Sequence, residues 1–251
     1  LDRAASREHQ QLVSALGGEY RNARAEQLLQ QVVAKLVPAS DRPSESYRVT
    51  ILNSPTVNAF ALPTGNVYVT RGLLALANDT SEIAGVLAHE MAHVTARHAV
   101  ARAEMEQRSM LVSRVVSEVL NDPAASEQVR DQTRLSIAGF SRAQELEADR
   151  IGVRTIAKAG YDPYGAARFL VSLSRNAELN GSSSRSAQGQ NFLSPRPTTP
   201  ERVSQAIAAA RQAGSSRPGA ADRNAFLSAI NGIAYGEDPA DGVVQGRRFQ
   251  H

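Results

Sequence analysis

The residues best suited to chemistry lie in the stretch HEMAH, residues 89–93, where two histidines stand four positions apart. On a helix, positions four apart differ by about 40° around the axis, so His89 and His93 share a face and Glu90 lies beside them. Two neutral imidazoles one turn apart can both reach a zinc ion at about 2.0–2.1 Å. A carboxylate next to that ion can accept a proton from water. The stretch therefore predicts His89 and His93 as metal ligands and Glu90 as a general base, provided that a third ligand exists.

A further histidine, His98, follows in the same segment, HEMAHVTARH. If the helix is continuous, His98 falls on the apolar stripe of Leu87 and Met91, so we expect a buried histidine with polar partners rather than a ligand. The metzincin pattern requires glycine and histidine at positions that are here Ala96 and Ala99. The third ligand must therefore come from further along the chain.

The segment SRAQELEADRIG, residues 141–152, is the candidate source of that ligand. On a helix Glu145 and Asp149 lie one turn apart on the face expected to be buried. Glu147 points the opposite way, together with Arg154. Two carboxylates on an inward face repel each other and are costly to bury unless a cation or a donor lies beside them.

Two interpretations of this carboxylate pair are open on the helix pattern alone. Arg142 and Arg150 could neutralise the acids without a metal. Beside two histidines that lack a third ligand, the metal interpretation is favoured, with Glu145 as the ligand. Asp149 is then expected to accept the outer N–H of a ligating histidine, which would fix its tautomer.

Composition excludes several classes of protein. The formal net charge is +3, but the basic residues are scattered among acidic ones, which disfavours a nucleic-acid interface. The absence of cysteine excludes disulfides, thiolate metal sites and thiol nucleophiles. No apolar run approaches the ~20 residues of a membrane helix. We therefore expect no transmembrane segment in this chain and no nucleic-acid partner.

The patterning predicts a helix-dominated α+β fold in one domain, residues 1–251, with a small antiparallel sheet beside the helix that holds HEMAH. Its expected parts are N-terminal helices (1–40), a catalytic core (45–205) and C-terminal helices with a tail (206–251). Within them we expect two N-terminal helices ending near Pro38, strands at 46–54, 57–62 and 66–70, and helices at about 79–101, 103–120, 124–138 and 141–159. A Ser-, Gly- and Pro-rich loop is expected at 180–199, and a helix begins at Thr199-Pro200.

HEMAHVTARH and SRAQELEADRIG together resemble the HtpX and CAAX-prenyl-protease family of zinc metallopeptidases, which pairs HExxH with the glutamate of ExxAD. VNAFALPTGNVYVTRGLL and SPRPTTPERV are similar to that family too, so the likeness spans about residues 45–205. Because the chain shows no membrane span, it is more similar to the soluble periplasmic, BepA-like branch. The resemblance implies a zincin-like fold of the gluzincin type and a periplasmic location.

The resemblance also implies the contents of the site. His89, His93 and Glu145 would hold one Zn²⁺ per chain, and Glu90 would be the general base. Substrates would be unfolded or extended polypeptides, including misfolded envelope proteins.

One departure from the family concerns the SPRP segment, where relatives carry a histidine that can reach the zinc. Here the position is Arg196, and a guanidinium does not ligate zinc. Arg196 and Asn58 are instead candidates to contact the substrate or the oxyanion, and an exposed loop arginine is an equal alternative for Arg196. The segment 180–199 and the helices at 103–138 are candidates for a lid.

The sequence therefore predicts a zinc-dependent metalloendopeptidase, with envelope protein quality control as its expected role. An extended peptide would add to strand 57–62 as an edge strand. The alternative is a chaperone-like or scaffold protein that keeps the zinc fold with little or no hydrolysis. An intact Glu90 argues against that alternative.

Overall fold

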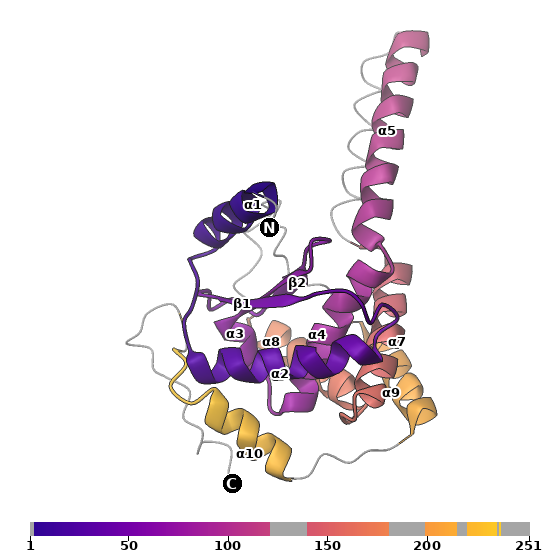
Figure 1. The fold of residues 1–251 in the computed structure, drawn as a ribbon. Coiled ribbons are helices and arrows are strands. Elements are labelled where there is room, and N and C mark those ends of the chain that lie inside the picture. Colours follow the sequence, from indigo (N-terminus) through magenta and orange to yellow (C-terminus); the bar gives the residue numbers. More distant parts are fainter. Residues whose placement is uncertain (1–2, 121–139, 181–198, 215–219, 235, 237–251) are drawn as a thin grey trace.

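The computed structural model describes residues 3–120, 140–180, 199–214, 220–234 and 236, which form a helical body around a small sheet (Figure 1). Its elements are α1 (Arg3–Ala15), α2 (Ala23–Ala39), β1 (Arg48–Leu52), β2 (Ala59–Ala61), β3 (Asn66–Thr70), α3 (Arg71–Leu76), α4 (Thr80–Thr95), α5 (His98–Leu120), α7 (Arg142–Lys158), α8 (Gly165–Asn180), α9 (Pro200–Ala213) and α10 (Ala220–Ala229). The predicted helix-dominated α+β class is confirmed. The division into domain parts stays a prediction.

The sheet has the strand order β1-β3-β2, with β3 in the centre. β2 runs antiparallel to β3, but β1 runs parallel to it, so the expected wholly antiparallel sheet is wrong for this pair. A tight turn with Gly65 at φ 86° reverses the chain between β2 and β3. That hairpin enters the sheet with β3 next to β1 and leaves β2 at an edge. Hydrophobic alternation locates strands but does not specify their order.

α4 is the central helix, in contact with α2, α7, α8 and β2. Asp79 is the N-cap residue of α4, and its side chain accepts a hydrogen bond from the backbone amide of Glu82 at 2.9 Å. Ile83, Leu87 and Met91 are fully buried in the main core, as the apolar stripe predicts. The opposite side of the helix is therefore left for polar side chains.

α4 ends at Thr95, so the predicted continuation to residue 101 is wrong. Arg97 adopts φ 58°, a left-handed conformation that breaks the helix, and α5 begins at His98. No glycine or proline marks this break in the sequence. α5 then extends away from the helical body (Figure 1).

Several expectations fall outside the described residues: the helix at 124–138, the loop 180–199 apart from its two ends, and the tail after Gly236. The proposed lid is therefore described only in part, through α5. Among the helices that the structure does describe, none combines the length and the apolar character needed to cross a membrane.

Candidate metal centre

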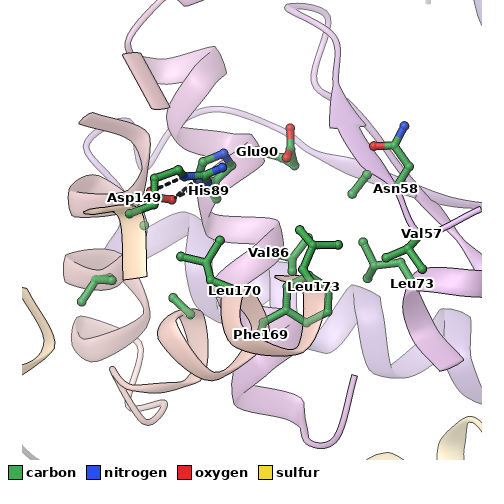
Figure 2. A pocket seen from close by; sticks show the side chains of 16 residues that line it. Val57, Asn58, Leu73, Val86, His89, Glu90, Asp149, Phe169, Leu170 and Leu173 are labelled. Carbon is green, nitrogen blue, oxygen red and sulfur yellow. Dashed lines mark hydrogen bonds and ion pairs between the residues drawn. The ribbon is translucent and has the colours of Figure 1, made fainter. Parts of the chain in front are cut away.

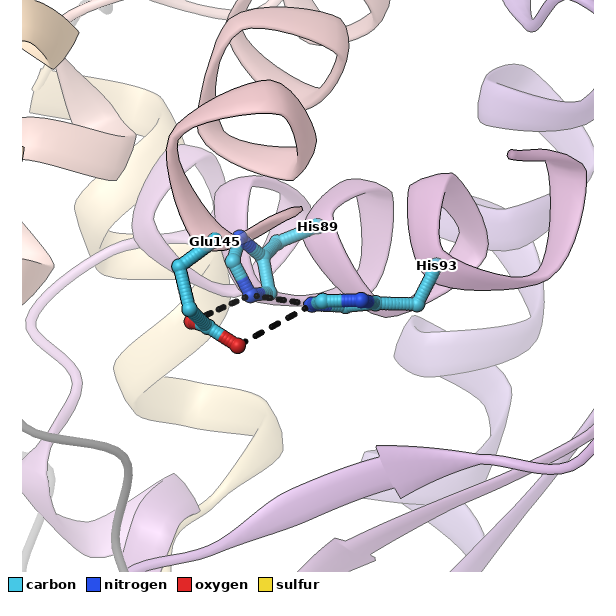
Figure 3. A group of neighbouring side chains, drawn as sticks. All are labelled: His89, His93 and Glu145. Atoms are coloured by element: carbon cyan, nitrogen blue, oxygen red, sulfur yellow. Dashed lines mark hydrogen bonds and ion pairs between the residues drawn. The ribbon is translucent and has the colours of Figure 1, made fainter. Parts of the chain in front are cut away.

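Three buried side chains from two helices converge on one point (Figure 3). The Nε2 atoms of His89 and His93 on α4 lie 3.1 Å apart. Each Nε2 lies 3.5 Å from an oxygen atom of Glu145, which projects from α7. These are the three side chains that the sequence predicts as ligands, and Glu145 lies more than 50 residues along the chain from the two histidines.

The donor set fits a zinc ion. In a tetrahedral site with bonds of about 2.0–2.1 Å, ligand atoms lie about 3.3 Å from one another. The separations of 3.1 and 3.5 Å between the three side chains are close to that value. Two imidazoles and one carboxylate also leave a fourth position open, as catalytic rather than structural zinc sites do.

Local sequence places these ligands. A capping box lies at the start of α7. The backbone amide of Gln144 donates to Ser141 Oγ, and the backbone amide of Ser141 donates to Gln144 Oε1. Glu145 therefore lies in the first turn of α7. Gly152 allows α7 to pass close to α4, since a Cβ at this position would lie 3.2 Å from the backbone nitrogen of His89. A larger residue would push the helices, and hence the ligands, apart.

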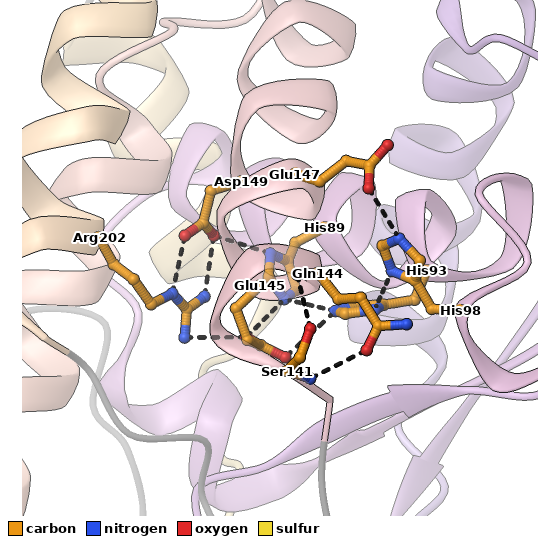
Figure 4. A network of polar contacts seen from close by, with 9 residues as sticks. All are labelled: His89, His93, His98, Ser141, Gln144, Glu145, Glu147, Asp149 and Arg202. Carbon is orange, nitrogen blue, oxygen red and sulfur yellow. Dashed lines mark hydrogen bonds and ion pairs between the residues drawn. The ribbon is translucent and has the colours of Figure 1, made fainter. Parts of the chain in front are cut away.

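Behind His89 lies a buried, charged network (Figure 4). His89 Nδ1 donates to Asp149 Oδ1 at 2.8 Å, the contact that the sequence predicts. Arg202 of α9 donates to both oxygens of Asp149, at 2.7 and 2.8 Å, and its Nη1 lies 3.0 Å from Glu145. One buried guanidinium thus faces two buried carboxylates. Among the described residues of this network the carboxylates outnumber the guanidinium, an arrangement that suits a bound cation.

The arginine partner of the acids was not anticipated. Arg142, one of the two expected neutralising residues, pairs with Glu201 at the surface, and Arg150 is exposed. Arg202 takes their place at 5% exposure. It lies on the face of α9 that also carries the buried Ala206 and Ala210. In the sequence, Arg202 is spaced four residues from Ala206, which in turn is four from Ala210, and this spacing could have indicated that the arginine is buried.

Electrostatics in this network favour charged forms. Burial acts to lower the pKa of His89, but its hydrogen bonds to Asp149 and Glu145 outweigh burial and raise the pKa to about 8. Burial likewise acts to raise the pKa of Asp149, and the hydrogen bonds from Arg202 and His89 instead lower it to about 2. At neutral pH and without a metal, the raised pKa therefore favours the imidazolium form of His89, whose positive charge helps to balance the two carboxylates.

His98 is a buried histidine with polar partners, as expected, although it lies on α5 rather than on α4. Its Nδ1 is 2.9 Å from His93 Nδ1, and its Nε2 is 3.2 Å from Glu147 Oε2. Glu147 thus contacts His98, whereas Arg154, placed with it by the helix pattern, pairs with Asp41. Phe140 stacks on the His93 ring at 4.0 Å.

A pocket of about 660 Å³, part of it open to solvent, is lined by His89 and Glu90 (Figure 2). Glu90 and His89 lie on one wall, and Asn58 lies on another. The backbone amide of Asn58 donates to Thr70 Oγ1, and the backbone carbonyl of Asn58 accepts from the backbone amide of Thr70. These two hydrogen bonds fix the start of β2. Much of the remaining lining is apolar and was not predicted: Val57, Leu73, Val86, Phe169, Leu170 and Leu173. Arg196 lies outside the described residues.

Comparison with known proteins agrees with this geometry. Residues 23–210 match the family described as Peptidase family M48, so the chain belongs to that family. Its fold and its arrangement of histidines and glutamate are those of a zincin-like member with the HExxH spacing and a distal glutamate.

Two curated relatives illustrate the match. The "Beta-barrel assembly-enhancing protease" of Escherichia coli (strain K12) is 30% identical over 156 residues, which cover 59% of this chain and 32% of the relative. The "Mitochondrial metalloendopeptidase OMA1" of Schizosaccharomyces pombe is 28% identical over 179 residues, 69% of this chain and 49% of the relative. The chain thus spans a third to a half of the length of these relatives.

Proposed function

We propose that this chain is a zinc-dependent metalloendopeptidase that hydrolyses unfolded or extended polypeptides. The observation that supports this most directly is that polar atoms of His89, His93 and Glu145 lie 3.1–3.5 Å from one another. Glu90 is adjacent to His89, and these two residues line the pocket. The family and the names of the relatives agree with a peptidase. The three side chains would hold one Zn²⁺.

The chemistry divides between the ion and the chain. When bound, zinc makes water more acidic and polarises a carbonyl group. Glu90, buried next to His89, accepts a proton from the attacking water and passes it to the leaving amine. Asp149 holds the His89 ring with its Nε2 toward the ligand cluster, and Arg202 holds Asp149. Glu90 lines the same pocket as His89, which is the position that this role requires.

The substrate is proposed to bind as an added strand. β2 is an edge of the sheet in the described part of the chain and packs against α4. A peptide paired with β2 would present its backbone to Glu90, so recognition would depend mainly on main-chain groups. The apolar pocket would receive one side chain next to the cleaved bond, and Asn58 at its rim would hydrogen-bond the substrate. Most of the backbone of a folded protein is already hydrogen-bonded, so unfolded or extended segments are the expected substrates.

The proposed biological role is the removal of misfolded polypeptides in the bacterial envelope, with a periplasmic location. This rests on similarity to a relative named beta-barrel assembly-enhancing protease. Arg196 is retained as a proposed contact for substrate or oxyanion.

Cleavage of unfolded casein by wild type and by Glu90→Gln, with zinc measured in both, tests the proposal. We expect one zinc per chain in each protein and cleavage by the wild type alone, because the amide cannot accept the proton. Asp41→Asn, an equivalent change in a surface ion pair 44% exposed at the aspartate, is the matched control and should cleave normally. Equal cleavage by wild type and Glu90→Gln would refute Glu90 as the base. Zinc binding without cleavage by the wild type would favour a binding protein over a peptidase.

A further inference from the structure

A second chain of polar contacts leads from the ligand cluster to the protein surface (Figure 4). His93 Nδ1 lies 2.9 Å from His98 Nδ1, and His98 Nε2 lies 3.2 Å from Glu147 Oε2. His93 and His98 are buried, whereas 48% of the Glu147 side chain is exposed. The three residues come from α4, α5 and α7 in turn.

With His98 neutral and Glu147 ionised, the contacts in this chain allow one consistent order of protons. An ionised carboxylate only accepts hydrogen bonds, so His98 must carry its proton on Nε2 to donate to Glu147. A neutral imidazole has one proton, and therefore His98 Nδ1 is an acceptor. His93 Nδ1 must then be the donor, and the proton of His93 is held on the side away from the ligand cluster. The Nε2 lone pair of His93 then points toward His89 and Glu145.

The reverse order is disfavoured. If His93 carried its proton on Nε2, its bare Nδ1 would require a proton on His98 Nδ1. The unprotonated Nε2 of a neutral His98 would then face the Glu147 carboxylate at 3.2 Å. Both groups would be acceptors, and no proton would lie between them. Partly buried acceptors without a donor between them are costly.

Packing fixes the ring but not its tautomer. Phe140 stacks on His93 with ring centroids 4.0 Å apart and an angle of 17° between the planes. The stacked ring holds the plane of the imidazole, and an apolar face does not distinguish one ring nitrogen from the other. His98 Nδ1 contacts the outer nitrogen of His93 at 2.9 Å and can distinguish the two tautomers.

We propose that His98 and Glu147 are positioning residues that hold His93 in the tautomer able to bind the metal through Nε2. The inference rests on the metal centre of the proposed function. Glu147 sets the proton on His98, and His98 sets the proton on His93. The half-exposed Glu147 carboxylate therefore determines the tautomer of the buried His93 through two successive hydrogen bonds.

The test combines nitrogen NMR with zinc affinity in the 251-residue chain. Two-bond proton–nitrogen spectra identify which ring nitrogen is protonated, and five histidines are few enough to assign by single substitutions. Spectra of the zinc-loaded and the chelator-treated chain would be compared for wild type, Glu147→Gln and Asp41→Asn. The side-chain amide introduced by Glu147→Gln can both donate and accept, so it satisfies either tautomer of His98. Asp41→Asn makes the same change in another half-exposed ion pair of α7, that of Arg154.

In chelator-treated wild type we expect the His93 proton on Nδ1 alone. Glu147→Gln should give a mixture of tautomers and a zinc affinity lower by about twofold for an equal mixture, because only one tautomer can bind the metal, with unchanged thermal stability. Asp41→Asn should match wild type in the His93 tautomer, in zinc affinity and in thermal stability. A proton on His93 Nε2 in wild type, or wild-type tautomer and affinity in Glu147→Gln, would overturn the proposal. A wild type that binds no zinc would refute the metal centre, while the tautomer in the metal-free chain would still decide this proposal.

Discussion

His89 and His93 are equivalent as proposed ligands, but the groups behind them differ. His89 is backed by Asp149 and Arg202, which are both buried and both charged. His93 is backed by His98 and then by Glu147, which reaches the surface. A buried ion pair that loses one partner leaves an uncompensated charge, whereas a half-exposed carboxylate can be replaced by water. The two sides should therefore respond to substitution in different ways: the first in stability and affinity, the second mainly in affinity.

The largest effect is expected from Arg202→Met. Removing the guanidinium leaves Asp149 and Glu145 buried without their shared cation, which should lower the free energy of unfolding of the metal-free chain by about 3–5 kcal/mol. Zinc should recover part of this loss, because it supplies positive charge next to the same carboxylates. Urea denaturation with chelator and with zinc measures both effects. A metal-free variant as stable as wild type would show that the network does not support the fold.

Asp149→Asn should weaken zinc binding by about 10–100-fold, since the carboxylate orients His89 through the 2.8 Å contact. Chelator competition gives the affinity directly. The comparison between the two sides requires this loss to exceed the loss in Glu147→Gln. Equal losses would mean that burial and charge behind the ligand make no difference.

Zinc affinity should also depend on pH through His89. Its pKa is raised from 6.5 to about 8 in the metal-free chain, and only the neutral imidazole can bind the metal. Affinity should be constant above pH 8 and fall by up to about tenfold per pH unit below it. The same raised pKa stabilises the metal-free fold below pH 6.5, and this contribution is lost as the pH rises through 8. Asp149→Asn should move both transitions to lower pH, since Asp149 is the main group that raises the pKa; transitions that stay in place would contradict that assignment.

The smallest effect is expected for Arg154→Ala. Arg154 pairs with Asp41, and both side chains are about half exposed, so solvent screens the pair. Its loss should change the free energy of unfolding by about 0–1 kcal/mol and leave zinc affinity as in wild type. A larger loss would mean that any change on α7 disturbs the ligands, and the contrast between buried and exposed partners would then lose its basis.

The two sides also differ in how far the sequence predicts them. Spacing within one helix is enough to place His89 beside His93 and Glu145 beside Asp149, because helical periodicity is a local property. Arg202 and the pairing of His98 with Glu147 depend on how α9 and α5 pack against α7, and no local pattern specifies that packing. The parallel pairing of β1 with β3 and the break at Arg97 were missed for the same reason.

Elemental analysis of zinc after dialysis tests the metal centre most directly, on wild type, Glu145→Ala and Asp41→Asn. The arrangement of His89, His93 and Glu145 predicts one zinc per chain in wild type and in Asp41→Asn, and none in Glu145→Ala. A wild type that retains no zinc from metal-supplied buffer, or a Glu145→Ala variant that retains as much as wild type, would contradict it.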